Sequence, residues 1–124
     1  MSFRCPECSA QSLAITRSFE LPADSRSDEI TLQIVKCSSC GFAGIAVYEE
    51  SRRGALDSES FSHTSYRVIA ADLRRLKHMI GRCPRPRDSR CGCAAHQSLG
   101  RRDASGRWNG LQAVACEGAS ELRR

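Results

Sequence analysis

Aromatic residues are scarce in this chain of 124 residues, which holds four Phe, two Tyr and one Trp. With so few large rings, we expect a modest hydrophobic core. Long hydrophobic runs are absent as well, and the longest stretch without a strongly polar residue is 41–47. A membrane-spanning helix needs about 20 mostly apolar residues. The sequence therefore predicts no such helix and no membrane partner.

The chain also lacks the short motifs of several enzyme classes. None of its histidines, His63, His78 and His96, begins a His-Glu-x-x-His or His-x-Glu sequence. A phosphate-binding loop, a dinucleotide glycine fingerprint and a nucleophile elbow are missing too. A catalytic zinc usually keeps an open position beside a general acid or base. We therefore expect no enzymatic activity and no small-molecule substrate, with a small zinc enzyme of unrecognised type as the alternative.

Cysteine, in contrast, is abundant, with eight residues in the chain. No apolar stretch precedes the first of them, Cys5, so we expect no secretory signal and a cytoplasmic protein. In a reducing compartment, closely spaced cysteines are read as metal ligands before disulfides. A secreted disulfide scaffold is the alternative, but it lacks the signal.

Four of the cysteines form two pairs in the pattern Cys-x2-Cys-x28-Cys-x2-Cys. Two residues between cysteines is the spacing of a tight turn that aims both thiolates at one ion, and Gly41 gives the backbone freedom to turn after the second pair. Four thiolates complete the tetrahedral shell of Zn²⁺ and leave no open position. The sequence predicts a structural zinc site with the ligands Cys5, Cys8, Cys37 and Cys40.

This segment, about residues 3–48, resembles the zinc-ribbon family, in which two cysteine knuckles at the ends of β-hairpins hold one structural zinc. The residues that carry the resemblance are Cys5, Pro6, Cys8, Cys37, Cys40 and Gly41. The resemblance implies a fold and a metal rather than a function, because zinc ribbons occur in transcription and translation components and as appendages of unrelated enzymes. A rubredoxin-like iron site and a dithiol redox pair are alternatives. The first would be expected to have more aromatic neighbours, and the second a βαβ setting.

A second cluster follows in the pattern Cys-x7-Cys-x-Cys-x2-His, formed by Cys83, Cys91, Cys93 and His96. Three thiolates and one imidazole match the ligand number and type of a second tetrahedral zinc. If a short helix begins near Ala94, Cys93 and His96 share one of its faces. Two alternatives stay open. The cysteines can be unliganded around an irregular turn, or His78 or Cys116 can replace His96.

Hydrophobic periodicity predicts a small α+β metal-stabilised protein. Alternation indicates strands near 13–19, 30–37 and 42–47, which make an antiparallel β zinc ribbon at 3–50. Residues 51–63 show no period and are expected to be a linker or loop. An amphipathic helix and the second zinc loop follow at 64–100, and a mostly flexible tail at 101–124. The apolar helix face is expected to pack on the ribbon or to mediate dimerisation, and it consists of Tyr66, Ile69, Ala70, Leu73, Leu76 and Ile80.

Charge is distributed unevenly along the chain. Residues 1–50 hold four basic and seven acidic residues, whereas residues 51–96 hold ten basic and four acidic ones. Clustered arginine can bind phosphates, so we expect an accessory factor that contacts DNA or RNA. The candidate contact residues are Arg67, Arg74, Arg75, Arg82, Arg85, Arg87 and Arg90. The alternatives are an adaptor that binds an acidic protein surface and a merely solvated basic face.

Overall fold

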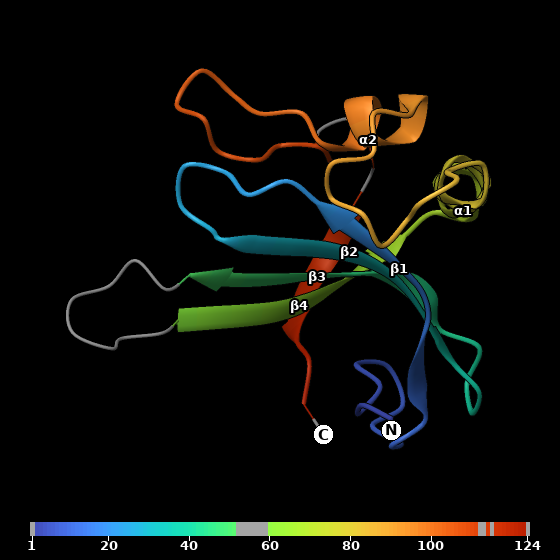
Figure 1. Cartoon of the computed structure of the whole chain (residues 1–124). Coiled ribbons are helices and arrows are strands. Elements are labelled where there is room, and N and C mark those ends of the chain that lie inside the picture. Colours follow the sequence, from blue (N-terminus) through green and yellow to red (C-terminus); the bar gives the residue numbers. More distant parts are fainter. Residues whose placement is uncertain (1, 52–59, 112–113, 115, 124) are drawn as a thin grey trace.

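A five-stranded antiparallel sheet forms the centre of the computed structural model, which describes residues 2–51, 60–111, 114 and 116–123 (Figure 1). The strand order in the sheet follows the chain, β1-β2-β3-β4-β5, and two helices lie between β4 and β5 in the sequence. The elements are β1 (Leu13–Leu21), β2 (Glu29–Cys37), β3 (Ala43–Ser51), β4 (Ser60–Val68), α1 (Ala70–Gly81), α2 (Ala94–Leu99) and β5 (Cys116–Glu121).

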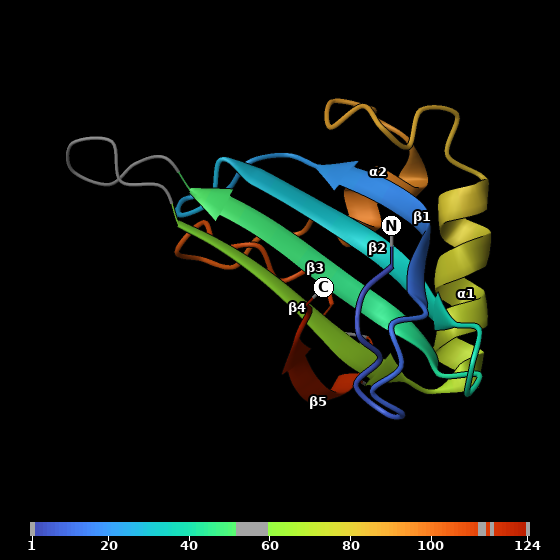
Figure 2. The same ribbon diagram turned by 90° about the horizontal axis from the view of Figure 1, so that it is seen from below.

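Both helices cover one face of the sheet, and the N-terminal segment crosses the other face (Figures 1 and 2). On the helix side, α1 buries Leu73, Leu76 and Ile80, which lie on one face at helical spacing. They pack against strand residues such as Leu32 and Ile45 in the larger core cluster. The expectation that the helix packs on the strands is confirmed. Within the described parts of the chain, neither helix has the length and apolarity needed to cross a membrane.

A second, smaller core lies on the opposite face, beneath the N-terminal segment. Phe3 is buried there and pairs through its backbone with Leu13, the first residue of β1. The other buried members of this core are Cys5, Val35, Cys37, Phe42, Ala46 and Leu122. The sheet therefore has apolar side chains on both faces, which explains why β2 and β3 are mostly buried.

A β-bulge in β1 allows that strand to serve both cores. Ile15 pairs with Val35, but Arg17 pairs with Ile34, so Thr16 is an extra residue in β1. An extra residue reverses the face to which the following side chains point. Leu13 and Ile15 accordingly join the smaller core, whereas Phe19 and Leu21 join the larger one. The sequence pattern suggested a single alternating face for 13–19, which is wrong for this reason.

The expected start of the helix at residue 64 is also wrong. Residues 60–68 form β4, which pairs along its length with β3, and Ile69 is the N-cap of α1. Tyr66 therefore lies on a strand, and Ile69 is 53% exposed rather than part of the buried helix face. Helical spacing from Tyr66 onward was coincidental, because Phe61, His63 and Ser65 also alternate in a strand period. Pairing with β3 satisfies the backbone of this segment.

The expected linker at 51–63 is corrected at both ends, because Ser51 is the last residue of β3 and residues 60–63 belong to β4, whereas 52–59 lie outside the described residues. The tail at 101–124 is also more regular than its sequence indicates. Residues 116–121 form β5, which pairs with β4, and Trp108, Leu111 and Val114 pack against the larger core. The local sequence pattern does not indicate β5. This strand depends on pairing with β4, which lies about 50 residues earlier in the chain.

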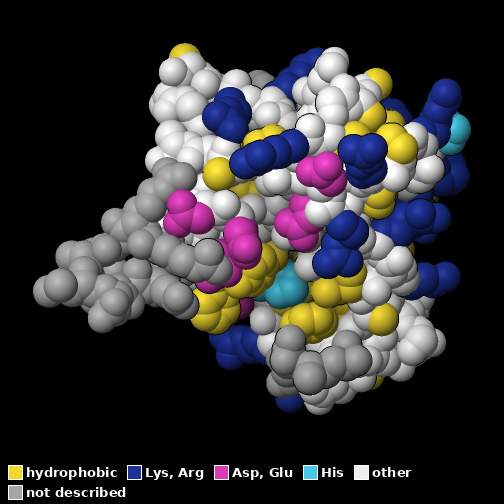
Figure 3. Space-filling view, in the orientation of Figure 1, with side chains coloured by type: hydrophobic (Ala, Val, Ile, Leu, Met, Phe, Trp, Pro, Cys, Tyr) yellow, Lys and Arg dark blue, Asp and Glu magenta, His cyan; other side chains and the backbone are white. Residues whose placement is uncertain are grey.

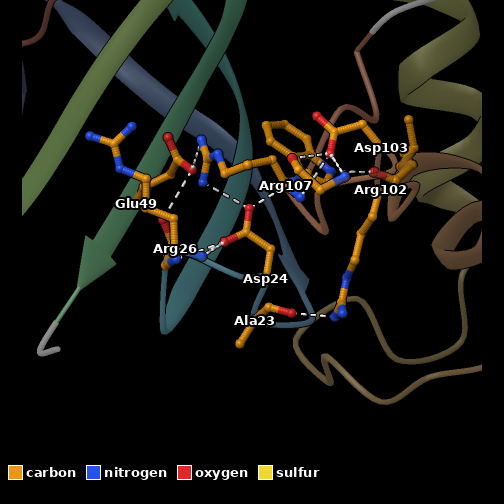
Figure 4. A network of polar contacts seen from close by, with 11 residues as sticks. Ala23, Asp24, Arg26, Glu49, Arg102, Asp103 and Arg107 are labelled. Atoms are coloured by element: carbon orange, nitrogen blue, oxygen red, sulfur yellow. Dashed lines mark hydrogen bonds and ion pairs between the residues drawn. The ribbon is translucent and has the colours of Figure 1, made fainter.

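A buried carboxylate attaches this tail to the turn between β1 and β2 (Figure 4). The Asp24 side chain has no exposed area and accepts hydrogen bonds from the amides of Arg26, Ser27 and Trp108 at 2.7–2.8 Å. Oδ2, the oxygen that accepts from the Trp108 amide, also lies 2.8 Å from Nη1 of Arg107. Desolvation raises the pKa of Asp24, but the three amides and the guanidinium outweigh it and hold that pKa below its usual value. The carboxylate is therefore charged and fully bonded in the fold.

Candidate metal centres

The first cluster lies at one end of the sheet, where two turns with the same geometry meet. In each turn the amide two residues after a cysteine donates to that cysteine's Sγ at 3.4 Å, from Glu7 to Cys5 and from Ser39 to Cys37. The amide four residues after the cysteine donates to its carbonyl, and that residue has a positive φ. The positive-φ positions are Ser9 (φ 64°) and Gly41 (φ 78°). The N-terminal knuckle thus has the same backbone as the second, with serine in place of glycine.

The four sulfur atoms have the spacing of a tetrahedral thiolate site. The Sγ atoms of Cys5 and Cys40 are 3.6 Å apart, and those of Cys8 and Cys37 are 3.8 Å apart. Four sulfurs at about 2.3 Å from a central ion would be separated by about 3.8 Å, whereas a disulfide needs about 2.05 Å. All four ligand atoms lie within 4.8 Å of one another. The cluster can therefore hold a metal ion without rearrangement.

The surroundings of the first cluster differ from one side to the other. Cys5 and Cys37 are buried in the smaller core, whereas Cys8 and Cys40 are exposed. The Ser12 hydroxyl lies 3.1 Å from Sγ of Cys37, and its hydrogen bond is the largest cause that lowers the pKa of Cys37 to about 6. A hydroxyl and amides that donate to the sulfur stabilise the thiolate form that binds metal.

The second cluster lies beside the helices. Cys83 follows the end of α1, Cys91 and Cys93 belong to the loop after it, and His96 lies in the first turn of α2. The helix near Ala94 that the sequence suggested is present, and Cys93 is its N-cap, whose Sγ accepts from the His96 amide at 3.5 Å. The capping sulfur and the imidazole are thus held on the same turn.

Its ligand atoms also fit a tetrahedral ion. Sγ of Cys83 and Sγ of Cys91 are 3.7 Å apart. Nδ1 of His96 lies 3.4 Å from Sγ of Cys83 and 3.2 Å from Sγ of Cys93. Metal distances of about 2.3 Å to sulfur and 2.1 Å to nitrogen would place sulfur and nitrogen about 3.6 Å apart. The structure thus gathers Cys83, Cys91, Cys93 and His96 into a second group that can hold an ion.

The imidazole of His96 is anchored to the edge of the sheet. Its Nε2 lies 2.9 Å from the carbonyl oxygen of Glu20 on β1, and the Glu20 amide donates to the Pro86 carbonyl at 2.8 Å. Because Nε2–H donates to that carbonyl, Nδ1 has a free lone pair that points toward the three thiols. The ring also packs on Phe19, with centroids 4.0 Å apart. The Pro86 loop and His96 together cover this part of the β1 edge.

The thiols of this cluster have unequal acidity. Desolvation raises the pKa of Cys93, but the hydrogen bonds that its sulfur forms with the imidazole and with the amide of His96 outweigh it and lower that pKa to about 6. Desolvation raises the pKa of Cys83 to about 11, and the neighbouring thiols contribute in the same direction. Metal binding therefore has to displace protons from the more buried thiol.

The other candidate ligands lie elsewhere. His78 is exposed on α1, and Cys116 is on β5, half-buried against the larger core, where burial raises the pKa of its thiol. His63 lies on β4, where Nε2 is 2.6 Å from Oε1 of Gln33 and the ring packs between Phe3 and Tyr48. None of the three belongs to either group of ligand atoms found among the described residues.

Most of the predicted basic contact residues lie together, around the helices and the second cluster. Arg74, Arg75 and Arg82 are exposed on or just after α1, and Arg85, Arg87 and Arg90 are exposed in the loop between Cys83 and Cys91. Figure 3 shows most of the Lys and Arg side chains toward the side of α1, and Asp and Glu nearer the middle.

Arg67 is the exception and a correction. The sequence placed it on the helix, but it lies on β4, pairs with Glu7 and stacks over the Phe42 ring at 5.6 Å. Because Arg67 lies on β4 rather than on a helix, its charge is paired with Glu7 of the N-terminal knuckle and is not part of the basic surface near α1.

Sequence reasoning missed the groups that support the ligands. Ser12 has no motif signal, although a hydroxyl close to a cysteine pair is a reasonable candidate donor. The Glu20 carbonyl has no sequence signal at all, because any residue at that position of β1 offers the same oxygen.

The chain was also compared with known proteins. No family model, no curated protein and no solved structure matches it.

Proposed function

We propose that both clusters bind Zn²⁺ as structural sites and that residues 3–48 act as a zinc ribbon. The support is the ligand chemistry together with the distances given above. Tetrahedral thiolate and thiolate–imidazole sets suit zinc, and four protein ligands leave no open position for a substrate. The protein is then not an enzyme, and reduced thiolates of this kind are compatible with the cytoplasm.

Zinc is preferred over iron because of the second cluster. A rubredoxin-like site uses four thiolates, and only the first cluster offers them. One metal that satisfies both ligand sets is the simpler assignment. Elemental analysis of the purified protein tests it, with two zinc ions per chain expected. One zinc per chain would remove the second site, and iron would replace the structural role with a redox one.

We further propose that the protein is an adaptor that binds an acidic protein segment on its basic surface. We define the basic surface as the exposed side chains of Arg74, Arg75, Lys77, Arg82, Arg85, Arg87 and Arg90. The observation that carries the proposal is its composition. Residues 70–99 hold these seven cations, two acidic residues and no Phe, Tyr or Trp. Such a surface attracts anions but offers no aromatic ring on which bases can stack.

Nucleic acid is the second candidate, which the sequence alone placed first. It is favoured by the predominance of arginine, which pairs with phosphate through two hydrogen bonds. Binding to DNA or RNA would release one counterion for each neutralised phosphate and would fall steeply with salt.

One experiment separates the two candidates. The zinc-loaded protein is titrated into a fluorescein-labelled acidic peptide and into labelled single- and double-stranded oligonucleotides at 50 and 150 mM salt. We expect micromolar binding of the peptide at 150 mM salt, and at least a fivefold loss in the Arg74→Ala/Arg75→Ala variant. The matched control is Arg4→Ala/Arg123→Ala, which removes two exposed arginines near the chain ends. Tighter binding of an oligonucleotide at 150 mM salt would replace the adaptor role with the nucleic-acid role.

A further inference from the structure

A groove lies between the two helices, at the border of the basic surface. Its volume is about 580 Å³, which is within the usual range of ligand sites. One side is formed by His78 and Met79 of α1 and by Arg82, its C-cap. The other is formed by Cys93, Ala94, Ala95 and Ser98 along α2. Both helices lie over the same face of the sheet (Figure 1).

The lining of the groove combines a small apolar floor with an exposed rim that carries the guanidinium of Arg82. Ala95 is buried and Met79 is partly buried against the larger core, whereas His78 and Arg82 are exposed. No acidic side chain is among the lining residues. Methionine and alanine offer an adaptable surface to an aliphatic side chain, and the rim favours carboxylates on either side of it.

The groove is attached to the second metal centre. Cys93 is both a member of the second cluster and a lining residue, and Ala94 and Ala95 follow it in the same helical turn. The spacing of α2 from α1 is set by Cys83, at the end of α1, and by Cys93 and His96, at the start of α2. An ion held by these residues would therefore set the shape of the groove floor.

We propose that this groove docks a single aliphatic side chain of an acidic peptide segment, with flanking carboxylates on Arg82 and on neighbouring cations of α1. The inference deepens the adaptor role and rests on it. The apolar anchor provides specificity that a purely charged surface lacks, because an aliphatic side chain gains from burial only where an apolar surface receives it. The charged rim mainly accelerates association.

The test uses two peptides that differ only in the anchor. Each has twelve residues rich in Asp and Glu, with Leu at the centre of one and Ala at the centre of the other. The zinc-loaded wild-type protein is expected to bind the Leu peptide at least tenfold more tightly by fluorescence anisotropy. Ser98→Leu fills the groove without a change in charge, so it should abolish this difference between the peptides. His96→Ala, which removes a ligand of the second centre, should do the same.

Two charge variants test the cation at the rim of the groove. Arg82→Gln removes the exposed cation that lines the groove, whereas Arg123→Gln removes an exposed cation outside both the groove and the basic surface. We expect Arg82→Gln to weaken the Leu peptide at least fivefold and Arg123→Gln less than twofold. Zinc content and circular dichroism verify the fold of each variant.

The outcomes distinguish this inference from the function on which it rests. Equal binding of the Leu and Ala peptides by wild type would overturn the groove and leave the basic surface as the adaptor site. Retention of the Leu preference by Ser98→Leu would overturn it as well. Binding of oligonucleotides but of neither peptide, or of no probe, would overturn both the groove and the adaptor role.

Discussion

The two candidate metal clusters have similar ligand geometry, but they differ in how far apart their ligands lie in the sequence. The first takes its ligands from two turns separated by 28 residues, and β1 and β2 bring them together. The second takes all its ligands from residues 83–96, and needs the sheet only as a support for His96 through Glu20. The first cluster exposes Cys8 and Cys40, whereas both Cys83 and His96 of the second are buried.

The difference shows what each ion would stabilise. An ion in the first cluster closes a long loop, so its binding is coupled to formation of the β1–β2 hairpin. An ion in the second cluster orders a short loop that has few apolar residues of its own. It also fixes α2 and the Pro86 loop on the edge of β1. An ion in the first cluster would therefore stabilise the sheet, whereas an ion in the second would stabilise the helix and loop that cover it.

If both clusters hold zinc as proposed, removal of both ions gives the largest expected effect. Each structural zinc would contribute on the order of 10 kcal/mol of apparent binding free energy, which is comparable to the whole stability of a small domain. Treatment with a strong chelator at neutral pH should therefore abolish the native circular dichroism spectrum. Cys116→Ser is the control, because Cys116 is in neither cluster and this variant should keep two ions. A metal-free protein that still unfolds cooperatively would contradict the prediction.

Deletion of Thr16 tests whether the bulge keeps the two cores on separate faces. Without the extra residue, either Leu13 and Ile15 or Phe19 and Leu21 must leave their core. Loss of two apolar side chains from their core should lower the free energy of unfolding by more than about 4 kcal/mol, measured by urea denaturation with zinc present.

The matched control for this deletion is Thr16→Ala. It keeps the bulge and loses only the hydrogen bond from Oγ1 of Thr16 to the Ile34 carbonyl, which costs about 1 kcal/mol. Similar losses in the deletion and the substitution would show that the bulge is unimportant.

Single-ligand variants test the independence of the two clusters. His96→Ala and Cys37→Ser each remove one ligand from one cluster, so native mass spectrometry should show one ion in each variant instead of two. We expect His96→Ala to retain the secondary structure of the sheet, whereas Cys37→Ser loses part of it, because Cys37 is fully buried in the smaller core. Loss of both ions in His96→Ala would show that β1 couples the clusters.

Asp24→Asn tests the buried carboxylate that attaches the C-terminal tail to the turn between β1 and β2. The substitution leaves a charged Arg107 and three amides with a weaker acceptor, so stability should fall by about 2 kcal/mol. Because the pKa of Asp24 is already lowered in the fold, its contribution is fully present above the ordinary carboxyl pKa and would be lost only as the pH falls below it. The deficit of the variant should therefore be equal at pH 6 and pH 8.

Asp103→Asn serves as the control for this measurement. Asp103 is exposed in the same tail and bonds only to residues near it in the chain, so its substitution should have a much smaller effect. A deficit of Asp24→Asn that changes between pH 6 and pH 8 would contradict the lowered pKa.

Ser12→Ala is expected to have the smallest effect. It removes the hydroxyl beside Sγ of Cys37 and should weaken metal binding at the first cluster by roughly tenfold. Competition with a chromogenic chelator measures this affinity. The affinity of the second cluster should stay unchanged, because Ser12 has no contact with it, and a loss at both clusters would contradict the local role of Ser12.

Much of the fold and of the sites was predictable where the signal was local. Cysteine spacing identified the residues that come together in each cluster, and alternation located β1, β2 and β3. The signal failed where long-range pairing decides the structure. Tyr66 fits a helical pattern yet lies on β4, and the residues of β5 show little pattern of any kind. Arg67 was placed on the wrong surface for the same reason.

The amino-acid sequence by itself determined the ligand sets, the position of the first three strands and the concentration of positive charge after residue 50. These are properties of neighbouring residues, which spacing and composition record. Only the tertiary structure decided that a bulge at Thr16 divides β1 between two cores and that the Glu20 carbonyl orients His96. Both depend on backbone groups of residues far apart in the chain, whose hydrogen bonds are independent of side-chain identity and therefore leave no pattern in the sequence.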